Sequence, residues 1–349
     1  MAVTTVPPIP DPEHVLCMPS EEEAHEGTWL QWPHNYGKYR HQQVKRYQES
    51  WIQMALALHS GERVHIIVYN EEQRTQVHAL LIARNCDMTQ IDFYCWPTND
   101  VWIRDSGPIF CWDNNNDYHQ LHVTNWGFNA WGNKYPFDLD NAIPSRVAHA
   151  LSLPTTTIPM INEGGLVELD GKGTLLAKRS SILNQNRNPG WTQTDAEAYF
   201  RKYLGVTNFI WLDGTKGLDI TDDHIDGTAR FANNGTTIVT FARDDFLVKK
   251  EYDCLKQATN AQGQSYKMVH LPLTKRKVYK REYGFYINYY VGNQVVLIPS
   301  FNDPQDGKAA AILQTLYPTH KVVSIPMTEV FKDGGMVHCV TQQQPMARP

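Results

Sequence analysis

Predicted strands and helices alternate along almost the whole sequence, and this alternation limits the fold more than any other feature. Val64 to Tyr69 is an apolar run typical of a buried strand, and Glu71 to Ala83 is predicted to be a helix. An earlier helix is predicted because apolar side chains recur at spacings of three and four, at Val44, Tyr47, Trp51, Met54 and Leu58. Such alternation is typical of α/β proteins. A unit of about sixty to seventy residues recurs roughly five times, without an obvious literal repeat.

No segment of the 349 residues marks a boundary between domains. The sequence has no Gly/Ser-rich linker, no long charge run and no long stretch of low complexity. A chain of this length can bury a substantial core, either in one large α/β body or in two ordinary ones. The simplest prediction is one domain that spans residues 1–349.

The charge pattern and the termini argue against several classes of partner. The net charge is −5 and there is no block of lysine and arginine, so the chain lacks the electrostatic signature of nucleic-acid or anionic-membrane binding. We find no signal-peptide pattern and no run that approaches the roughly twenty apolar residues of a membrane span. The six cysteines are scattered without CxxC pairs, as in reduced intracellular proteins. We therefore expect a cytoplasmic protein; its mild negative charge is compatible with a cationic ligand.

A cysteine, Cys339, lies ten residues from the C-terminus, shortly after the pair Gly334-Gly335. Glycines permit close backbone approach, and the apolar and β-branched residues beside the cysteine predict a short strand over 337–341. Such a strand would present the thiol from a rigid edge. Taken alone, the position favours a buried structural thiol over a nucleophile.

Two carboxylates precede glycines. Asp105 is expected at the mouth of a strand with Trp102 three residues earlier, and an aromatic ring beside a carboxylate suits a planar cation. The alternative is that Arg104 and Asp105 form local ion pairs. Glu163 precedes Gly164-Gly165 and would either fix the tautomer of a histidine or act as an ordinary turn acid.

His224 and Asp226 are two residues apart, so in an extended segment both side chains would point to the same side. This pair permits two chemistries. In the first, Cys339 is a nucleophile, His224 moves protons, Glu163 orients His224, and Asp105 and Asp226 bind a cationic substrate. In the second, Asp222-x-His224-x-Asp226 binds manganese, as in hydrolases that split guanidines to urea. The second requires more ligands, and we find no convincing second histidine-carboxylate cluster.

Taken together, these motifs resemble the agmatine deiminase and bacterial-type (Porphyromonas-type) peptidylarginine deiminase family, from about Met18 to Pro345. The resemblance rests on their combination and order, since no single motif would suffice. The motifs are Trp102-x-Arg104-Asp105-x-Gly107-Pro108, Trp126-Gly127-Phe128-Asn129-Ala130-Trp131-Gly132, Glu163-Gly164-Gly165, His224-Ile225-Asp226, Asn302-Asp303-Pro304-x-Asp306 and Gly334-Gly335-x-x-His338-Cys339-x-Thr341-Gln342-Gln343.

The resemblance implies the pentein fold, a five-bladed α/β propeller of ββαβ-like modules around a central site. It also implies a hydrolase acting on C–N bonds of linear amidines, in which a covalent thiouronium forms on the cysteine and no metal or organic cofactor takes part. A homodimer is a further family-level expectation. The implied roles are nucleophile for Cys339, general acid/base for His224, histidine partner for Glu163, guanidinium-binding carboxylates for Asp105 and Asp226, pocket wall for Trp102 and site lining for Asn288.

The sequence departs from the family pattern just before His224. Many agmatine deiminases have an acid where this chain has Ile220 and a glycine where it has Asp223. Because an acid near the pocket is lost, the distal end of the substrate is the least constrained feature. We expect agmatine, converted to N-carbamoylputrescine and ammonia in putrescine and polyamine metabolism. The alternatives are free or C-terminal peptidyl arginine, which would give citrulline, and a manganese-dependent guanidine hydrolase.

Overall fold

The computed structural model describes residues 7, 15–37, 41–113, 120–242, 249–280 and 282–347, and within them one three-stranded arrangement occurs five times. In each arrangement the first strand pairs antiparallel with the second, and the second pairs in parallel with the third. The five are β5-β6-β7 (Ile109–Asp113, Leu121–Gly127, Thr155–Ile161), β8-β9-β10 (Val167–Leu169, Thr174–Lys178, Asn208–Leu212), β11-β12-β13 (Arg230–Ala232, Thr237–Phe241, Lys267–Leu271), β16-β17-β18 (Tyr290–Val291, Val295–Ser300, Lys321–Pro326) and β19-β2-β3 (Gln342–Pro345, His25–Gln31, Arg63–Val68).

Four further strands extend or connect these sheets. A hairpin joins the third and fourth arrangements in sequence, and one strand is added to each of two sheets. They are β1 (Leu16–Cys17) beside β5, β4 (Ile91–Cys95) beside β3, and the hairpin β14-β15 (Leu273–Tyr279, Glu282–Phe285).

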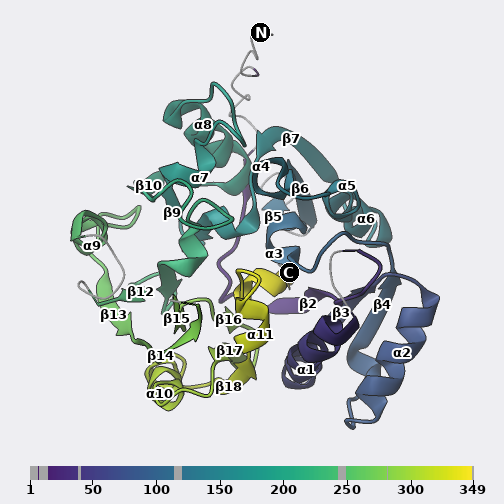
Figure 1. The fold of residues 1–349 in the computed structure, drawn as a ribbon. Helices are drawn as coiled ribbons and strands as arrows, with labels where there is room; N and C mark the ends of the chain where they lie inside the picture. Colours follow the sequence, from purple (N-terminus) through teal and green to yellow (C-terminus); the bar gives the residue numbers. More distant parts are fainter. Residues whose placement is uncertain are drawn as a thin grey trace.

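The last strand closes the arrangement by pairing with the first unit. Gln342 lies opposite Trp29 and Gln344 opposite Gly27, so β19 supplies the first strand of the sheet that β2 and β3 began. Figure 1 shows the units around a centre, where the C-terminal segment, drawn in yellow, lies. The five predicted α/β units are therefore confirmed, with one of them completed by the C-terminus.

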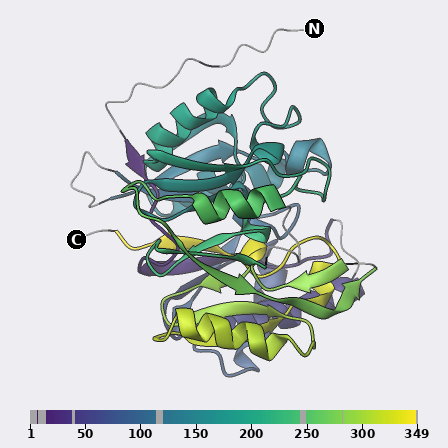
Figure 2. The ribbon, with the colours of Figure 1, turned by 90° about the vertical axis from the view of Figure 1, so that its left-hand side faces the viewer.

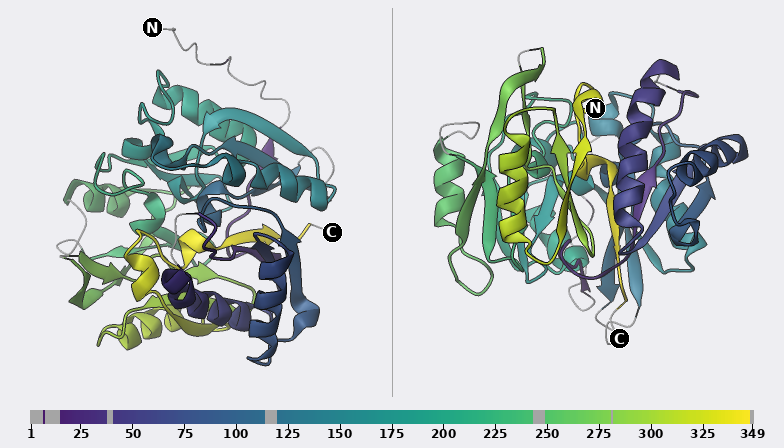
Figure 3. Two further views of the ribbon diagram at one scale, coloured as in Figure 1. Left: turned by 45° about the vertical axis from the view of Figure 1, so that its right-hand side comes forward. Right: turned by 90° about the horizontal axis from the view of Figure 1, so that it is seen from below.

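Helices lie mainly on the outside of the ring, while the C-terminal segment passes through its interior (Figures 2 and 3). The predicted helix over residues 44–58 is α1, and Val44, Tyr47, Trp51, Met54 and Leu58 are all buried on it. The helices are α1 (His41–Leu58), α2 (Glu71–Ile82), α3 (Ile103–Ser106), α4 (Ala130–Asn133), α5 (Asp138–Asn141), α6 (Ile143–Ala150), α7 (Arg179–Ile182), α8 (Gln193–Leu204), α9 (Lys249–Gln257), α10 (Asp306–Leu316) and α11 (Thr328–Phe331).

Two segments that were expected to be extended are short helical turns: Asp226 lies in the 3-10 turn η4 (Ile225–Gly227) and Cys339 in the 3-10 turn η5 (His338–Val340). Asp105, expected at the mouth of a strand, lies in the short helix α3 just before β5. Periodicity cannot identify a single turn of three or four residues inside an apolar run, which explains the error. Each turn is followed within a few residues by the first strand of a unit, as are η3 (Gly164–Leu166) and the segment 286–289; a further 3-10 turn, η1 (Met88–Gln90), precedes β4.

Candidate active site

The fold brings together residues that occupy the same position in each of the five units. Each lies within four residues of the start of its unit's first strand. They are Asp105 before β5, Glu163 before β8, Asp226 before β11, Asn288 before β16 and Cys339 before β19. Because the units surround one centre, residues separated by more than two hundred positions in sequence meet there (Figure 1).

Cys339 is held by the side chain of Asn288. Oδ1 of Asn288 accepts hydrogen bonds from the backbone N–H groups of His338 at 3.0 Å and Cys339 at 3.3 Å, and it lies 3.4 Å from the Cys339 thiol sulfur. Gly335 allows the backbone shortly before Cys339 to approach the ring of Trp102 closely. A Cβ atom at residue 335 would lie 2.3 Å from a ring carbon. Trp102 therefore packs beside the turn that leads to the thiol.

The surroundings of Cys339 favour the protonated thiol in the absence of a cation. Burial raises its pKa well above the ordinary value, and the Asp226 and Asp105 carboxylates raise it further. The sulfur lies 3.8 Å from Oδ2 of Asp226. A positive group bound between these carboxylates would offset their effect and favour the thiolate.

His224 is fixed by Glu163, which is itself fixed by Arg187. Nε2 of His224 lies 2.9 Å from one Glu163 oxygen, and Arg187 contacts both Glu163 oxygens, at 3.0 and 3.3 Å. Burial alone would lower the pKa of His224, but Asp105, Glu163 and Asp226 together raise it to about 9. The imidazolium form is therefore present at neutral pH.

Asp105 is one of the carboxylates of the same cluster. Its Oδ2 accepts a hydrogen bond from the Trp131 indole at 2.9 Å, its Oδ1 accepts one from the Gly165 backbone at 3.1 Å, and Nδ1 of His224 lies 3.7 Å from Oδ1. Gly165 is required, since a Cβ atom there would lie 2.5 Å from Nδ1 of His224. Burial, with smaller effects of Glu163 and Asp226, raises the pKa of Asp105 to about 6 despite the nearby His224.

Asp226 is the second carboxylate of the cluster. Its Oδ2 lies 2.9 Å from Nδ1 of His338 and accepts a hydrogen bond from the Asn288 amide at 3.2 Å. Burial would raise the pKa of Asp226, but His338, His224 and Arg230 hold it below the ordinary range. Asp226 therefore remains ionised beside the thiol.

The residues before His224 serve structural contacts. Arg187 donates to Asp222, and this bond together with one from Asn186 lowers the pKa of Asp222 to about 2, against the opposing effect of burial. Asp223 forms a buried ion pair with Lys178, and its φ of +76° explains why a glycine suits this position.

The proposed manganese run Asp222-x-His224-x-Asp226 therefore does not converge on one point, because its three side chains have different partners. Within the ranges that the structure describes, no group of three or more histidine, cysteine or carboxylate side chains is arranged to hold a metal ion. No helix among these residues is both long and apolar enough to span a bilayer.

All seven sequence-predicted site residues thus lie in or beside one buried cluster, with Trp102 packed against the turn at Gly335. Sequence reasoning assigned no role to four residues that hold the cluster together: Glu21, Trp131, Arg187 and His338. Trp131 and His338 stand in quoted motifs, and Arg187 is a lone cation in the polar run Asn184-Gln185-Asn186-Arg187-Asn188. Glu21 carries no signal beyond the acidic run in which it lies.

Comparison with known proteins places the chain in a family. A sequence model of the family described as "Porphyromonas-type peptidyl-arginine deiminase" matches residues 17–345. The agmatine deiminase of Pseudomonas aeruginosa (strain LESB58) is 30% identical, and a Latilactobacillus sakei protein named provisionally as an agmatine deiminase is 32% identical; each match covers 95% of this chain and 96% of the relative. The solved structure of the Enterococcus faecalis agmatine deiminase superposes with a TM-score of 0.85 at 26% identity, over 95% of this chain and 96% of that one.

These similarities agree with the five-unit ring and confirm the pentein fold expected from the resemblance. They also identify the chain as a hydrolase of C–N bonds in linear amidines. The chain belongs to the Porphyromonas-type peptidyl-arginine deiminase family, which includes the agmatine deiminases it resembles.

Proposed function

We propose that this chain is an agmatine deiminase, which hydrolyses agmatine to N-carbamoylputrescine and ammonia through a covalent intermediate on Cys339. The observation that carries the proposal is the meeting of a thiol, two carboxylates and a charged imidazole in one buried cluster. The names of the relatives that match nearly the whole chain support agmatine as the substrate.

The two carboxylates suit the planar guanidinium group. Asp105 and Asp226 would accept its N–H groups by charge-assisted hydrogen bonds, as carboxylates bind planar cations generally. Asn288 would fix the Cys339 and Asp226 side chains relative to one another, since it contacts both. The bound group would then lie with its central carbon next to the thiol.

The positive charge of the substrate would itself activate the nucleophile. In the empty site the two carboxylates raise the pKa of Cys339, and the guanidinium neutralises their effect, so that binding favours loss of the thiol proton. The thiolate attacks the guanidinium carbon and forms a carbon–sulfur bond. The resulting tetrahedral carbon carries both terminal amino groups.

His224 would supply the proton that makes ammonia a leaving group. Glu163 occupies Nε2, so Nδ1 is the nitrogen that faces Asp105 and the substrate position. Transfer of this proton releases ammonia and leaves a thiouronium on Cys339. Neutral His224 then takes a proton from water and the hydroxide adds to the same carbon. The carbon–sulfur bond breaks, the added hydroxyl group loses its proton to solvent, and the ureido product and the thiolate are released.

Substrate choice is tested by incubating the purified protein with agmatine and with free arginine in separate reactions that contain a chelator. Ammonia together with N-carbamoylputrescine from agmatine is the expected result. Turnover of arginine or a C-terminal arginyl peptide, without turnover of agmatine, would agree with the cysteine mechanism but contradict agmatine as the substrate. Urea formed only after manganese is restored would overturn both.

Other expectations extend the proposal beyond the site. We propose that residues 1–349 form one domain, that the protein works in the cytoplasm without a bound cofactor or nucleic acid, and that it forms a homodimer. Light scattering on the purified protein would give its mass in solution and so check the last expectation.

A further inference from the structure

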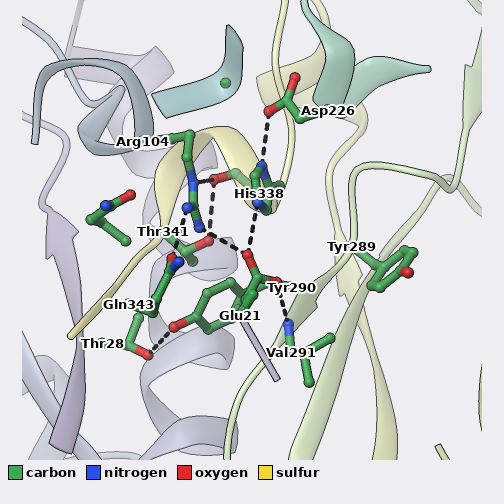
Figure 4. A network of polar contacts seen from close by, with 12 residues as sticks. Glu21, Thr28, Arg104, Asp226, Tyr289, Tyr290, Val291, His338, Thr341 and Gln343 are labelled. Atoms are coloured by element: carbon green, nitrogen blue, oxygen red, sulfur yellow. Dashed lines mark hydrogen bonds and ion pairs between the residues drawn. The ribbon is translucent and has the colours of Figure 1, made fainter. Parts of the chain in front are cut away.

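His338 lies between two buried carboxylates that contact opposite nitrogens of its ring. Nδ1 lies 2.9 Å from Oδ2 of Asp226, and Nε2 lies 2.9 Å from Oε2 of Glu21 (Figure 4). The histidine side chain is 2% exposed and the Glu21 side chain 9%. Solvent therefore does not replace either partner, and the ring connects the two acids directly.

The geometry requires both ring nitrogens to donate. A neutral imidazole has one N–H group and one lone pair, so one of the two carboxylates would face a lone pair at hydrogen-bond distance. Only the imidazolium has two N–H groups and satisfies both contacts. Donation to both carboxylates at once therefore takes the imidazolium form of the ring.

Glu21 is anchored independently of His338. Its Oε1 lies 3.0 Å from Nη2 of Arg230 and accepts a hydrogen bond from the Val291 backbone at 2.9 Å, while Arg104 donates to Oε2 at 3.3 Å. Burial would raise the pKa of Glu21, but Arg230, His338 and Arg104 hold it well below the ordinary value. Glu21 is a fixed anion, and it stabilises the charged form of His338.

The contacts on Asp226 are one-sided. Among the described residues, every side-chain contact to its carboxylate, from His338, Asn288 and the Cys339 thiol, ends on Oδ2. The other oxygen, Oδ1, is left for a cation. Because the thiol lies 3.8 Å from Oδ2, a thiolate there would repel Asp226 and favour its protonation unless a positive group compensates on the far side.

We propose that His338, supported by Glu21, is a positioning residue that keeps Asp226 ionised and turned so that Oδ1 faces the guanidinium. This inference rests on the proposed function and adds to it a residue pair, His338 and Glu21, beside Asp226. It explains why a histidine directly precedes the nucleophile. One turn carries both the Cys339 thiol and the His338 cation, and this cation offsets the repulsion between the thiolate and Asp226.

Two substitutions separate the contacts of the ring. In His338→Asn the amide nitrogen takes the place of Nδ1 and can still donate to Asp226, whereas in His338→Gln it takes the place of Nε2 and can donate only to Glu21. We expect His338→Gln to raise KM by about tenfold or more, the cost of one charge-assisted hydrogen bond, and His338→Asn to recover part of that loss. Loss of the cation raises the pKa of Asp226 toward that of Asp105, so in His338→Gln a second ionisation should join the acid limb of kcat/KM, steepen it and move it to higher pH.

His25→Gln is the matched control. His25 is also a buried histidine beside an acid, with Glu62 at 3.3 Å, but its ring contacts Glu21 only at the backbone carbonyl and does not touch Asp226. We expect it to lower the melting temperature without moving the acid limb. Equal loss of activity in both His338 variants, with an unmoved acid limb, would overturn the inference and leave only a structural role.

A second readout does not depend on turnover. The carboxyl carbon resonance of Asp226 in protein labelled with [13C]aspartate, assigned by its absence in Asp226→Asn, reports the ionisation of this group directly. Its titration midpoint should move to higher pH in His338→Gln and, by a smaller amount, in Glu21→Gln. An unchanged midpoint in both folded variants would contradict the inference even if the wild type deiminates agmatine, and inactivity of the wild type would instead contradict the proposed function.

Discussion

The indole Nε1 of Trp131 donates a hydrogen bond to Oδ2 of Asp105 at 2.9 Å, so one oxygen of this buried carboxylate is held by an aromatic side chain. Trp131 is 4% exposed and adopts a φ of +56°, inside a helical turn that the backbone breaks at this residue. Its position is therefore set by the turn and not by a regular element.

Trp131→Phe removes this donor and keeps most of the ring. A hydrogen bond to a charged group contributes about 1.5–3 kcal/mol, so kcat/KM should fall roughly 10- to 100-fold. The bond lowers the pKa of Asp105, and its loss should also move the acid limb of the pH profile upward. Steady-state kinetics between about pH 5 and 9 would show both effects; a uniform loss at every pH would argue against the role given to the indole.

The wild-type enzyme should lose substrate affinity in mild acid. The pKa of Asp105 is raised to about 6, so this carboxyl becomes protonated as the pH falls through that value and no longer attracts the guanidinium. We expect kcat/KM to fall about tenfold per pH unit below this point, the slope for one ionisation. A profile that stays flat down to about pH 5, one unit below the raised pKa, would contradict the environment described for Asp105.

Glu163→Gln should move the basic limb of the pH–rate profile to lower pH. Glu163 raises the pKa of His224, so its neutralisation lowers that pKa from about 9 and the imidazolium is lost at a lower pH. Because buried Arg187 then keeps only Asp222 as a charged partner, the variant should also lose stability, by less than the about 3–5 kcal/mol expected for a charge left wholly unpaired. Denaturant titration and pH–rate profiles test the two effects separately.

The raised pKa of Cys339 predicts a slow reaction with neutral alkylating agents. The rate of iodoacetamide modification of the Cys339 peptide, followed by mass spectrometry, should rise with pH and show no plateau up to about pH 9. A plateau near neutral pH would show that a stable thiolate exists in the empty enzyme and that substrate charge is not needed to form it.

The buried pair Lys178–Asp223 predicts a stability effect at the position where the family often has glycine. Asp223→Gly relieves a left-handed backbone but leaves Lys178 without its partner, so we expect a net loss of about 2–4 kcal/mol. The double variant Asp223→Gly with Lys178→Met should regain most of it. If the single variant were as stable as the wild type, the pair would contribute nothing.

The sequence allowed the five units to be predicted, because strand–helix alternation is a local pattern, and it allowed Asp105, Glu163 and Asp226 to be singled out as acids near glycines. Asn288, and the catalytic role expected of Cys339, came only from the resemblance to a known family. The sequence did not allow the turns that carry Asp105, Asp226 and Cys339 to be predicted, since three or four residues are too few for periodicity. Contacts made only by the closed ring were also missed: Glu21 and His338 are 317 positions apart and meet because β19 returns to pair with β2.

The central claim is that Cys339 forms a covalent bond to the guanidinium carbon, and acid quenching during turnover tests it most directly. Digestion and mass spectrometry should then show the Cys339 peptide carrying the mass of agmatine less ammonia, and Cys339→Ala should show neither the adduct nor turnover. Steady release of ammonia with no adduct on this peptide, or activity retained in Cys339→Ala, would contradict the account.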